Sequence, residues 1–224
     1  MTNTLHRHGN AGSFANDYIV FAIPCRGYNE QGCVPRLREF LRRALRHHPV
    51  NWGDASHGAI FRPTKKLTPF AHWVRSDERR PEEVIEGVDT ATTVAAVFDN
   101  PGAVENFLRE LRGADLGLSV NVSATIEGAR HCCRNAGLVR HSVEYSLPYM
   151  GNTEKLPEPR VLEIATMCGH GMVSFDFTRK MLDWVRAGRR TPDQTAGYLA
   201  RFCSCGIFNP CRAAAIFRQA QPGR

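Results

Sequence analysis

The sequence lacks a hydrophobic run long enough to cross a membrane, since no stretch approaches about 18 apolar residues. The segment from Met1 to Asn16 is polar and lacks the hydrophobic run of a signal peptide. Internal repeats, low-complexity tracts and recognised nucleic-acid-binding motifs are also missing. We therefore expect a cytoplasmic globular protein with a flexible N-terminal tail over residues 1–16, and neither a membrane nor a nucleic acid as its partner.

The composition is that of an ordinary globular chain. Its 224 residues are 42% hydrophobic and 23% charged, and a chain of this length buries roughly 70% of its unfolded surface. These values argue against intrinsic disorder and against a miniprotein held together by disulfides. Lys and Arg number 29 against 22 Asp and Glu, which gives a net charge of +7. That balance is compatible with an anionic ligand, and we expect a small anionic substrate or a redox partner.

Apolar patterning predicts strands that alternate with helices. The run 17–24 is continuous, β-branched and stopped by Pro24, as in a buried strand. Residues 35–48 place apolar side chains at helical spacing. The same reasoning predicts strands over 92–98, 118–124, 141–147 and 161–166, and helices over 101–112, 126–136 and 191–202, with two more ending near 187 and 220. This alternation indicates an α/β fold with a parallel or mixed sheet.

The predicted elements divide the chain into two parts. An α/β core is expected over residues 17–150, and a strand with a helical, cysteine-bearing segment over 151–224. We expect the two parts to pack together as one domain.

Eight cysteines are the most informative feature. With no export signal and a chain large enough to fold unaided, reduced thiols are the better expectation, and clustered thiols then point to ligands or catalysts. Four of the eight fall in the last 57 residues. The cysteines are Cys25, Cys33, Cys132, Cys133, Cys168, Cys203, Cys205 and Cys211.

The first motif is the turn Cys168-Gly169-His170-Gly171, placed where the predicted strand 161–166 gives way to a helix. Glycines let the backbone approach a ligand, and the N–H groups of a first helical turn favour a thiolate or a bound anion. Cys168 is therefore expected to have a lowered pKa and to act as a nucleophile or metal ligand. A structural cysteine in a tight turn is the alternative.

The second motif, Cys203-Ser204-Cys205-Gly206, repeats this pattern 35 residues later. Two cysteines separated by one residue in an extended segment point to one side. Asn209 and Pro210 predict the start of a helix, with Cys211 in its first turn. Because a helical hairpin brings its ends close, Cys168, Cys203, Cys205 and, as a fourth member, Cys211 are expected to converge.

Such a cluster suits an iron–sulfur centre, which is held mainly by thiolates. We expect a 4Fe–4S cluster bound by Cys168, Cys203, Cys205 and Cys211, with contacts from Gly169, Gly171, Gly206 and Asn209. Three ligands would leave one iron open for a lyase reaction, whereas four would suit electron transfer. Zinc is the rival, with Cys168, His170, Cys203 and Cys205 as a tetrahedral set. Neither spacing matches the paired C-x-x-C pattern of common zinc modules or ferredoxins.

A metal-free thiol enzyme, an isomerase or transferase, is a further alternative. The segment Met167-Cys168-Gly169-His170-Gly171 resembles the first catalytic-cysteine motif of the proline racemases and related epimerases. The resemblance implies a thiolate pair acting at the α-carbon of a substrate. It covers this segment and, weakly, Cys205-Gly206, but the second motif's Gly-Thr-Gly is absent and the two turns are too close in sequence. We interpret it as shared local physics and not as family membership.

Other polar residues complete the expected site. His170 is expected to donate a proton or support a ligand, and Arg212 to anchor an anion. Cys25 and Arg26 follow the first strand and are candidates to line the pocket. A third reading of the chain is a zinc-stabilised binding protein. Two further groups have a functional alternative, but we interpret both as solvated. The basic loop His57, Arg62, Lys65 and Lys66 could bind an anionic substrate, and the strand residues His141, Glu144 and Tyr145 could supply acid–base groups.

Overall fold

The computed structural model describes residues 6–62, 79–146 and 148–221. Five strands form one sheet in the spatial order β3-β2-β4-β1-β5, and every pairing between them is antiparallel. The mixed α/β composition is confirmed, whereas the expectation of parallel pairing is wrong. The strands are β1 (Tyr18–Ile23), β2 (Asn51–Asp54), β3 (Gly58–Ala59), β4 (Val94–Phe98) and β5 (Ser119–Ser123).

Antiparallel pairing arises because each helical connection skips one strand. Helix α2 (Val34–Leu45) joins β1 to β2, and α5 (Pro101–Ala114) joins β4 to β5. Strands β1 and β2 run in the same direction, but β4 lies between them and pairs with both. This split β-α-β arrangement depends on strand order, which the sequence pattern does not specify.

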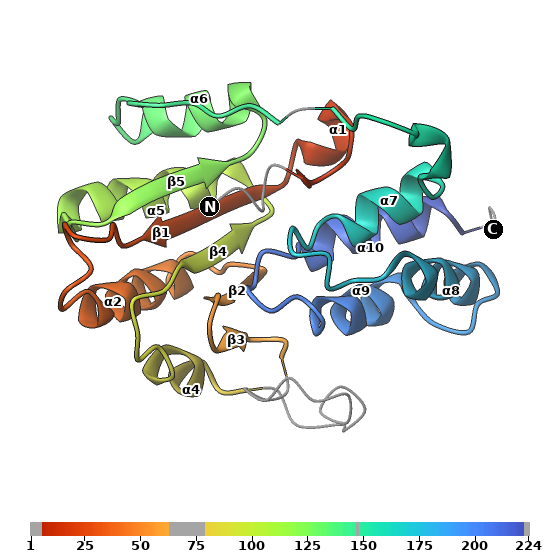
Figure 1. The fold of residues 1–224 in the computed structure, drawn as a ribbon, viewed down its shortest axis with the longest axis horizontal. Helices are drawn as coiled ribbons and strands as arrows, with labels where there is room; N and C mark the ends of the chain where they lie inside the picture. Colours follow the sequence, from red (N-terminus) through yellow and green to blue (C-terminus); the bar gives the residue numbers. More distant parts are fainter. Residues whose placement is uncertain (1–5, 63–78, 147, 222–224) are drawn as a thin grey trace.

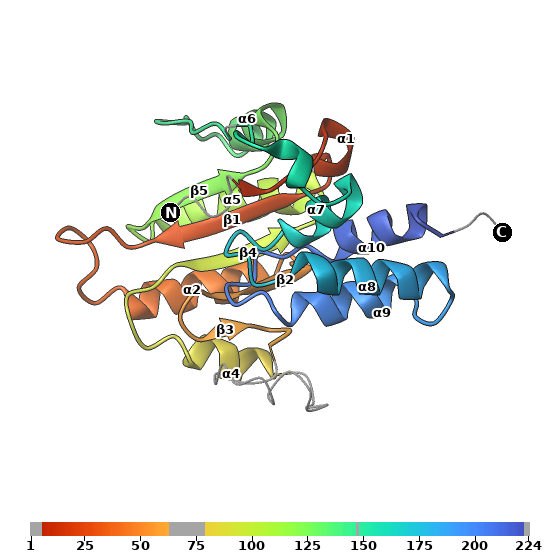
Figure 2. The ribbon, with the colours of Figure 1, turned by 45° about the vertical axis from the view of Figure 1, so that its right-hand side comes forward.

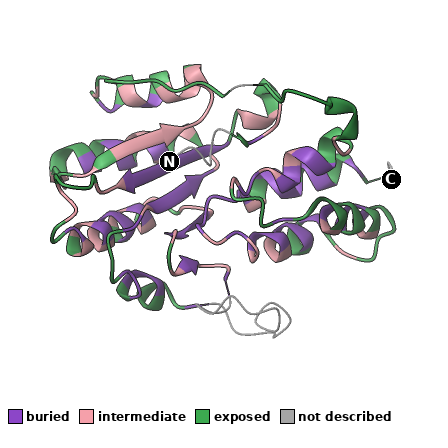
Figure 3. Ribbon diagram, in the orientation of Figure 1, coloured by how far each residue is buried: buried purple, intermediate pink, exposed green. Residues whose placement is uncertain are grey.

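The two faces of the sheet support two separate cores. Along β1, Val20 and Ala22 face α2 and α5, whereas Ile19 and Phe21 face the C-terminal helices. These helices lie beside the sheet as one group (Figures 1 and 2), and the central strands are buried (Figure 3). They are α7 (Pro159–Ala165), α8 (Phe175–Arg186), α9 (Pro192–Ala200) and α10 (Pro210–Gln219).

Two predicted strands are absent from the described residues. Residues 141–146 have no regular structure and are exposed, and most of 161–166 belongs to helix α7. Pro159 begins that helix at its first position, and four of its seven residues are buried apolar side chains. A short apolar run cannot be told from a buried helix by its periodicity, so this prediction was wrong. The sequence also predicts a short element over residues 70–74, which lie outside the described part of the chain.

The other elements are small or lie at the edges of the sheet. They are the helices α1 (Ala11–Phe14), α4 (Pro81–Glu86) and α6 (Ile126–Asn135) and the 3-10 turn η2 (Thr153–Lys155). No helix in the described parts of the chain combines the length and apolar character that a membrane crossing needs.

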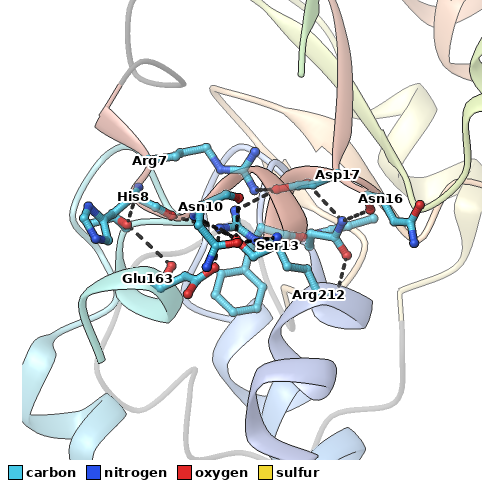
Figure 4. A network of polar contacts seen from close by, with 12 residues as sticks. Arg7, His8, Asn10, Ser13, Asn16, Asp17, Glu163 and Arg212 are labelled. Carbon is cyan, nitrogen blue, oxygen red and sulfur yellow. Dashed lines mark hydrogen bonds and ion pairs between the residues drawn. The ribbon is translucent and has the colours of Figure 1, made fainter. Parts of the chain in front are cut away.

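A buried ion-pair network ties the N-terminal segment to the rest of the molecule (Figure 4). Asp17, which is fully buried, accepts hydrogen bonds from Arg7 at 2.5 Å and from Arg212 at 2.8 Å. Arg212 also pairs with Glu163 of α7 at 2.8 Å. Residues 6–16 are therefore packed against β1, α7 and α10, in contrast to the flexible tail expected over 1–16.

Candidate functional site

Three thiols from two distant turns meet in one buried place. Cys168 lies in the turn after α7, and Cys203 and Cys205 lie in the loop between α9 and α10. The Cys168 thiol is hydrogen-bonded to that of Cys203, whose sulfur is 3.9 Å from the Cys205 sulfur. All three side chains are buried on the face of the sheet covered by the C-terminal helices. Helices α8 and α9 connect the two turns as a helical hairpin, and the closeness of its two ends is what the sequence predicts.

His170 and several backbone N–H groups surround these sulfurs. The Nδ1 atom of His170, an exposed residue, lies 3.4 Å from the Cys205 sulfur. The N–H groups of His170 and Met172 donate to the Cys168 sulfur, and that of Phe208 donates to Cys203. Such N–H donors are what a thiolate ligand requires of its surroundings.

The surroundings of Cys168 and Cys203 raise the pKa of both thiols. The hydrogen bond to Cys203 and then burial raise the pKa of Cys168 well above its usual range. The hydrogen bond with Cys168 lowers the pKa of Cys203, but the Cys205 contact and burial raise it to about 12. The lowered pKa expected for Cys168 is therefore wrong. Helix α8 begins only at Phe175, so its positive end is not adjacent to this thiol.

Gly206 fixes the cysteine loop against the sheet. It has φ of +76°, and a Cβ atom there would lie 2.7 Å from the carbonyl carbon of Trp52 in β2. The side-chain amide of Asn51 also donates to the Phe208 carbonyl at 2.8 Å. Only glycine permits this approach. Gly206, expected to contact a cofactor, thus supports the site through backbone packing.

The β2–β3 hairpin adds a cation that the sequence interpretation had placed in a solvated loop. Arg62 is only 4% exposed, and its Nε and Nη2 atoms have no hydrogen-bond partner among the described residues. Burial lowers the pKa of its guanidinium, and its favourable charge interactions are with Cys203, Cys168 and Cys205. The sequence carries no signal for this burial, because it depends on a long-range contact. Lys65 and Lys66 of the same loop lie outside the described residues.

Three predicted site residues have other partners. Cys211 is exposed in the first turn of α10, where its thiol contacts Asp99 and not the other cysteines. Asn209 caps α10 through the N–H of Arg212 at 2.9 Å and donates to Asp17 at 2.9 Å. Arg212 pairs with two carboxylates, those of Asp17 at 2.8 Å and Glu163 at 2.8 Å.

The remaining candidates lie away from the thiols or face solvent. The loop with Cys25 and Arg26 is at the end of the sheet opposite the C-terminal helices (Figures 1 and 2), and both residues are exposed. His141, Glu144 and Tyr145 are exposed as well.

A cavity of about 680 Å³ leads to the cysteine turn. Cys168, Gly169 and Gly171 form part of its wall, and His6, Lys155 and Arg179 add basic groups at other points. Asp176, also in the wall, pairs with Arg179 at 2.5 Å. A small molecule in this cavity would be in contact with the Cys168 turn.

No group of three or more His, Cys, Asp or Glu side chains within the described ranges is arranged so that it could hold a metal ion as it stands. No protein-family model, curated protein or solved structure matches the chain.

Proposed function

We propose that this chain binds an iron–sulfur cluster through Cys168, Cys203 and Cys205 and uses it in a lyase-type or redox reaction. The observation that carries the proposal is the contact of three buried thiols that come from two turns far apart in sequence. Buried cysteines are common in protein cores, but it is typical of a ligand site that Cys203 contacts both other thiols and that backbone N–H groups are directed at the Cys168 and Cys203 sulfurs.

The positive charge of Arg62 is compatible with cysteine ligands that are ionised when they bind a metal centre. Metal binding displaces the protons of cysteine ligands and leaves thiolates. The buried guanidinium of Arg62, whose Nε and Nη2 atoms lack a hydrogen-bond partner in the described part of the chain, would then interact with negative charge. In a 4Fe–4S cluster each thiolate binds a different iron, so the three sulfurs, which are in contact in the metal-free chain, would separate when the cluster binds.

The number of available ligands favours a substrate-binding cluster over an electron-transfer one. Cys211 is the fourth predicted ligand, and its thiol contacts Asp99. Three ligands leave one iron without a protein thiolate. When bound, a cluster of this kind supplies a Lewis acid for a substrate oxygen, and the cavity beside Cys168 gives a small anionic substrate access.

Zinc is a second candidate because the pairwise spacings suit it. Tetrahedral zinc with Zn–S bonds of 2.3 Å places two sulfurs about 3.8 Å apart and a sulfur and a nitrogen about 3.5 Å apart. The Cys203–Cys205 and Cys205–His170 separations are 3.9 Å and 3.4 Å. A metal-free nucleophile has less support, because the raised pKa of Cys168 leaves it a thiol at neutral pH. All these chemistries are compatible with the reducing cytoplasm that we propose as its location.

The decisive experiment is anaerobic purification followed by iron, sulfide and zinc analysis. We expect about three or four irons per chain with matching sulfide, whereas the zinc alternative gives one zinc. Cys203→Ser should abolish loading, and Cys211→Ser, a change at an exposed cysteine outside the cluster, should leave it intact. A metal-free protein after anaerobic reconstitution, or equal loading of both variants, would refute the proposal.

A further inference from the structure

Cys203 and Cys205 form a close pair of thiols in the loop between α9 and α10. Their sulfur atoms are 3.9 Å apart, and both residues are reduced. A disulfide joins two sulfurs at about 2.05 Å, so a movement of about 1 Å by each sulfur would bring the pair to bonding distance. The pair is separated by Ser204 alone, and the next residue, Gly206, packs against the backbone of β2. The loop therefore holds these two sulfurs next to each other.

The two thiols differ in their access to reagents from solution. Cys205 is 4% exposed, whereas Cys203 is fully buried. The Nδ1 atom of His170, an exposed residue, lies 3.4 Å from the Cys205 sulfur. A cysteine beside a histidine is the usual arrangement of a nucleophile, because the imidazole takes up the proton when the sulfur attacks. A small reagent would therefore react first with Cys205, and the net charge of +7 favours an anionic one.

Cys203 is suited to the second step of such a reaction. The hydrogen bond with Cys168 lowers its pKa, but the Cys205 contact and burial raise it to about 12. A buried, protonated thiol reacts slowly with external reagents, yet it can attack a sulfur that is already in contact with it. The backbone N–H of Phe208 donates to the Cys203 sulfur and would stabilise the negative charge that develops there during the attack.

We propose that Cys203 and Cys205 are a dithiol redox site that reduces a small anionic disulfide of the glutathione type, with Cys205 as the attacking sulfur and Cys203 as the resolving one. This inference concerns the metal-free chain and does not rest on the proposed function. It gives the thiol cluster an activity that requires sulfurs in contact.

The reaction has two steps of thiol–disulfide exchange. The Cys205 sulfur first attacks one sulfur of the small disulfide, whose S–S bond breaks. One small thiol leaves with the proton of Cys205, which His170 can transfer. The Cys203 sulfur then attacks the Cys205 sulfur, and the second small thiol leaves with the proton of Cys203. The cysteine pair has lost two electrons and two protons, and the small disulfide has gained them.

The test treats full-length Cys211→Ser protein, reduced and freed of metal with a chelator, with oxidised glutathione and maps its tryptic peptides. Trypsin releases residues 202–212 as one peptide, which in this variant contains only Cys203 and Cys205 as cysteines. We expect this peptide to lose the mass of two hydrogen atoms and to regain it with dithiothreitol. Cys33, which is 1% exposed, should remain a free thiol in the same digest.

Two variants in the same background test the order of attack. Cys203→Ser should accumulate a glutathione adduct on Cys205, because the resolving thiol is missing. Cys205→Ser should form an adduct on Cys203 at least about tenfold more slowly, because that thiol is fully buried. If either variant does not fold, the mass of the peptide 202–212 in the parent protein still tests the cysteine pair.

Three outcomes would overturn the inference. They are a peptide 202–212 that keeps its full mass in excess oxidised glutathione, a cross-link from it to the peptide 161–179 that carries Cys168, and equal adduct rates in the two variants. The metal content of the purified protein is measured separately. Failure of the inference therefore leaves the proposed function untouched, and the reverse is also true.

Discussion

Replacing Asp17 should destabilise the fold more than any other single change in the ion-pair network of Figure 4. Asp17 is fully buried, and its carboxylate accepts from Arg7, Arg212 and Asn209 at 2.5, 2.8 and 2.9 Å. Asp17→Ala leaves two buried guanidinium groups without this partner. Breaking a buried pair in this way costs about 3–5 kcal/mol. We expect a loss near the upper end of that range, since Arg7 has no second carboxylate partner among the described residues.

The measurement is urea unfolding at pH 7 followed by circular dichroism. Glu163→Gln is the matched comparison: the side chain of Glu163 is 12% exposed, and among the described residues its only ion pair is with Arg212. It should lower the free energy of unfolding by about 1–3 kcal/mol, because a single charged hydrogen bond is weakened. Equal losses for the two variants, or a loss below about 1 kcal/mol for Asp17→Ala, would refute the reasoning.

Three further predictions concern the glycine contact and the thiols. Gly206→Ala should lower the free energy of unfolding in urea, and the iron content after loading, more than Gly188→Ala does. Both glycines have positive φ, which costs an alanine about 1–2 kcal/mol, but of the two only Gly206 would place the added Cβ atom against other atoms. Burial raises the pKa of Cys132 to about 11. The unfolded chain therefore ionises first, and the free energy of unfolding should fall from pH 9 to 11, with a smaller slope in Cys132→Val; equal slopes would contradict this. In metal-free native protein at pH 7.5, iodoacetamide should label exposed Cys25 at least about tenfold faster than buried Cys203, as mass spectrometry can determine.

Much of the secondary structure could be predicted because it has local causes. The strand predicted over 17–24 is β1, and the helix predicted over 191–202 is α9, with Thr191 as its cap. Asn209 caps α10 through the interaction that its residue type suggests. These features depend on periodicity and on hydrogen bonds within one turn, which a single sequence carries.

The site was less accessible to prediction because its geometry is non-local. The meeting of the Cys168 turn with the Cys203 loop could be expected from the helical hairpin between them. The raised pKa of Cys168 could not be predicted. The residues of α7 were expected to form a strand, and that expectation placed Cys168 at the start of the following helix. Arg62 was missed altogether, because its burial follows from the packing of the β2–β3 hairpin near the thiol cluster.

The buried carboxylate of Asp17 also constrains the order in which the protein can be completed during translation. Arg7 and Asp17 leave the ribosome early, but the second arginine arrives about 195 residues later. Until then the group of helices that covers one face of β1 is incomplete, because α10 is missing, and Ile19 and Phe21 on that side are less well covered. Nascent chains stalled before α10 should therefore be recognised by chaperones, whereas released chains should not.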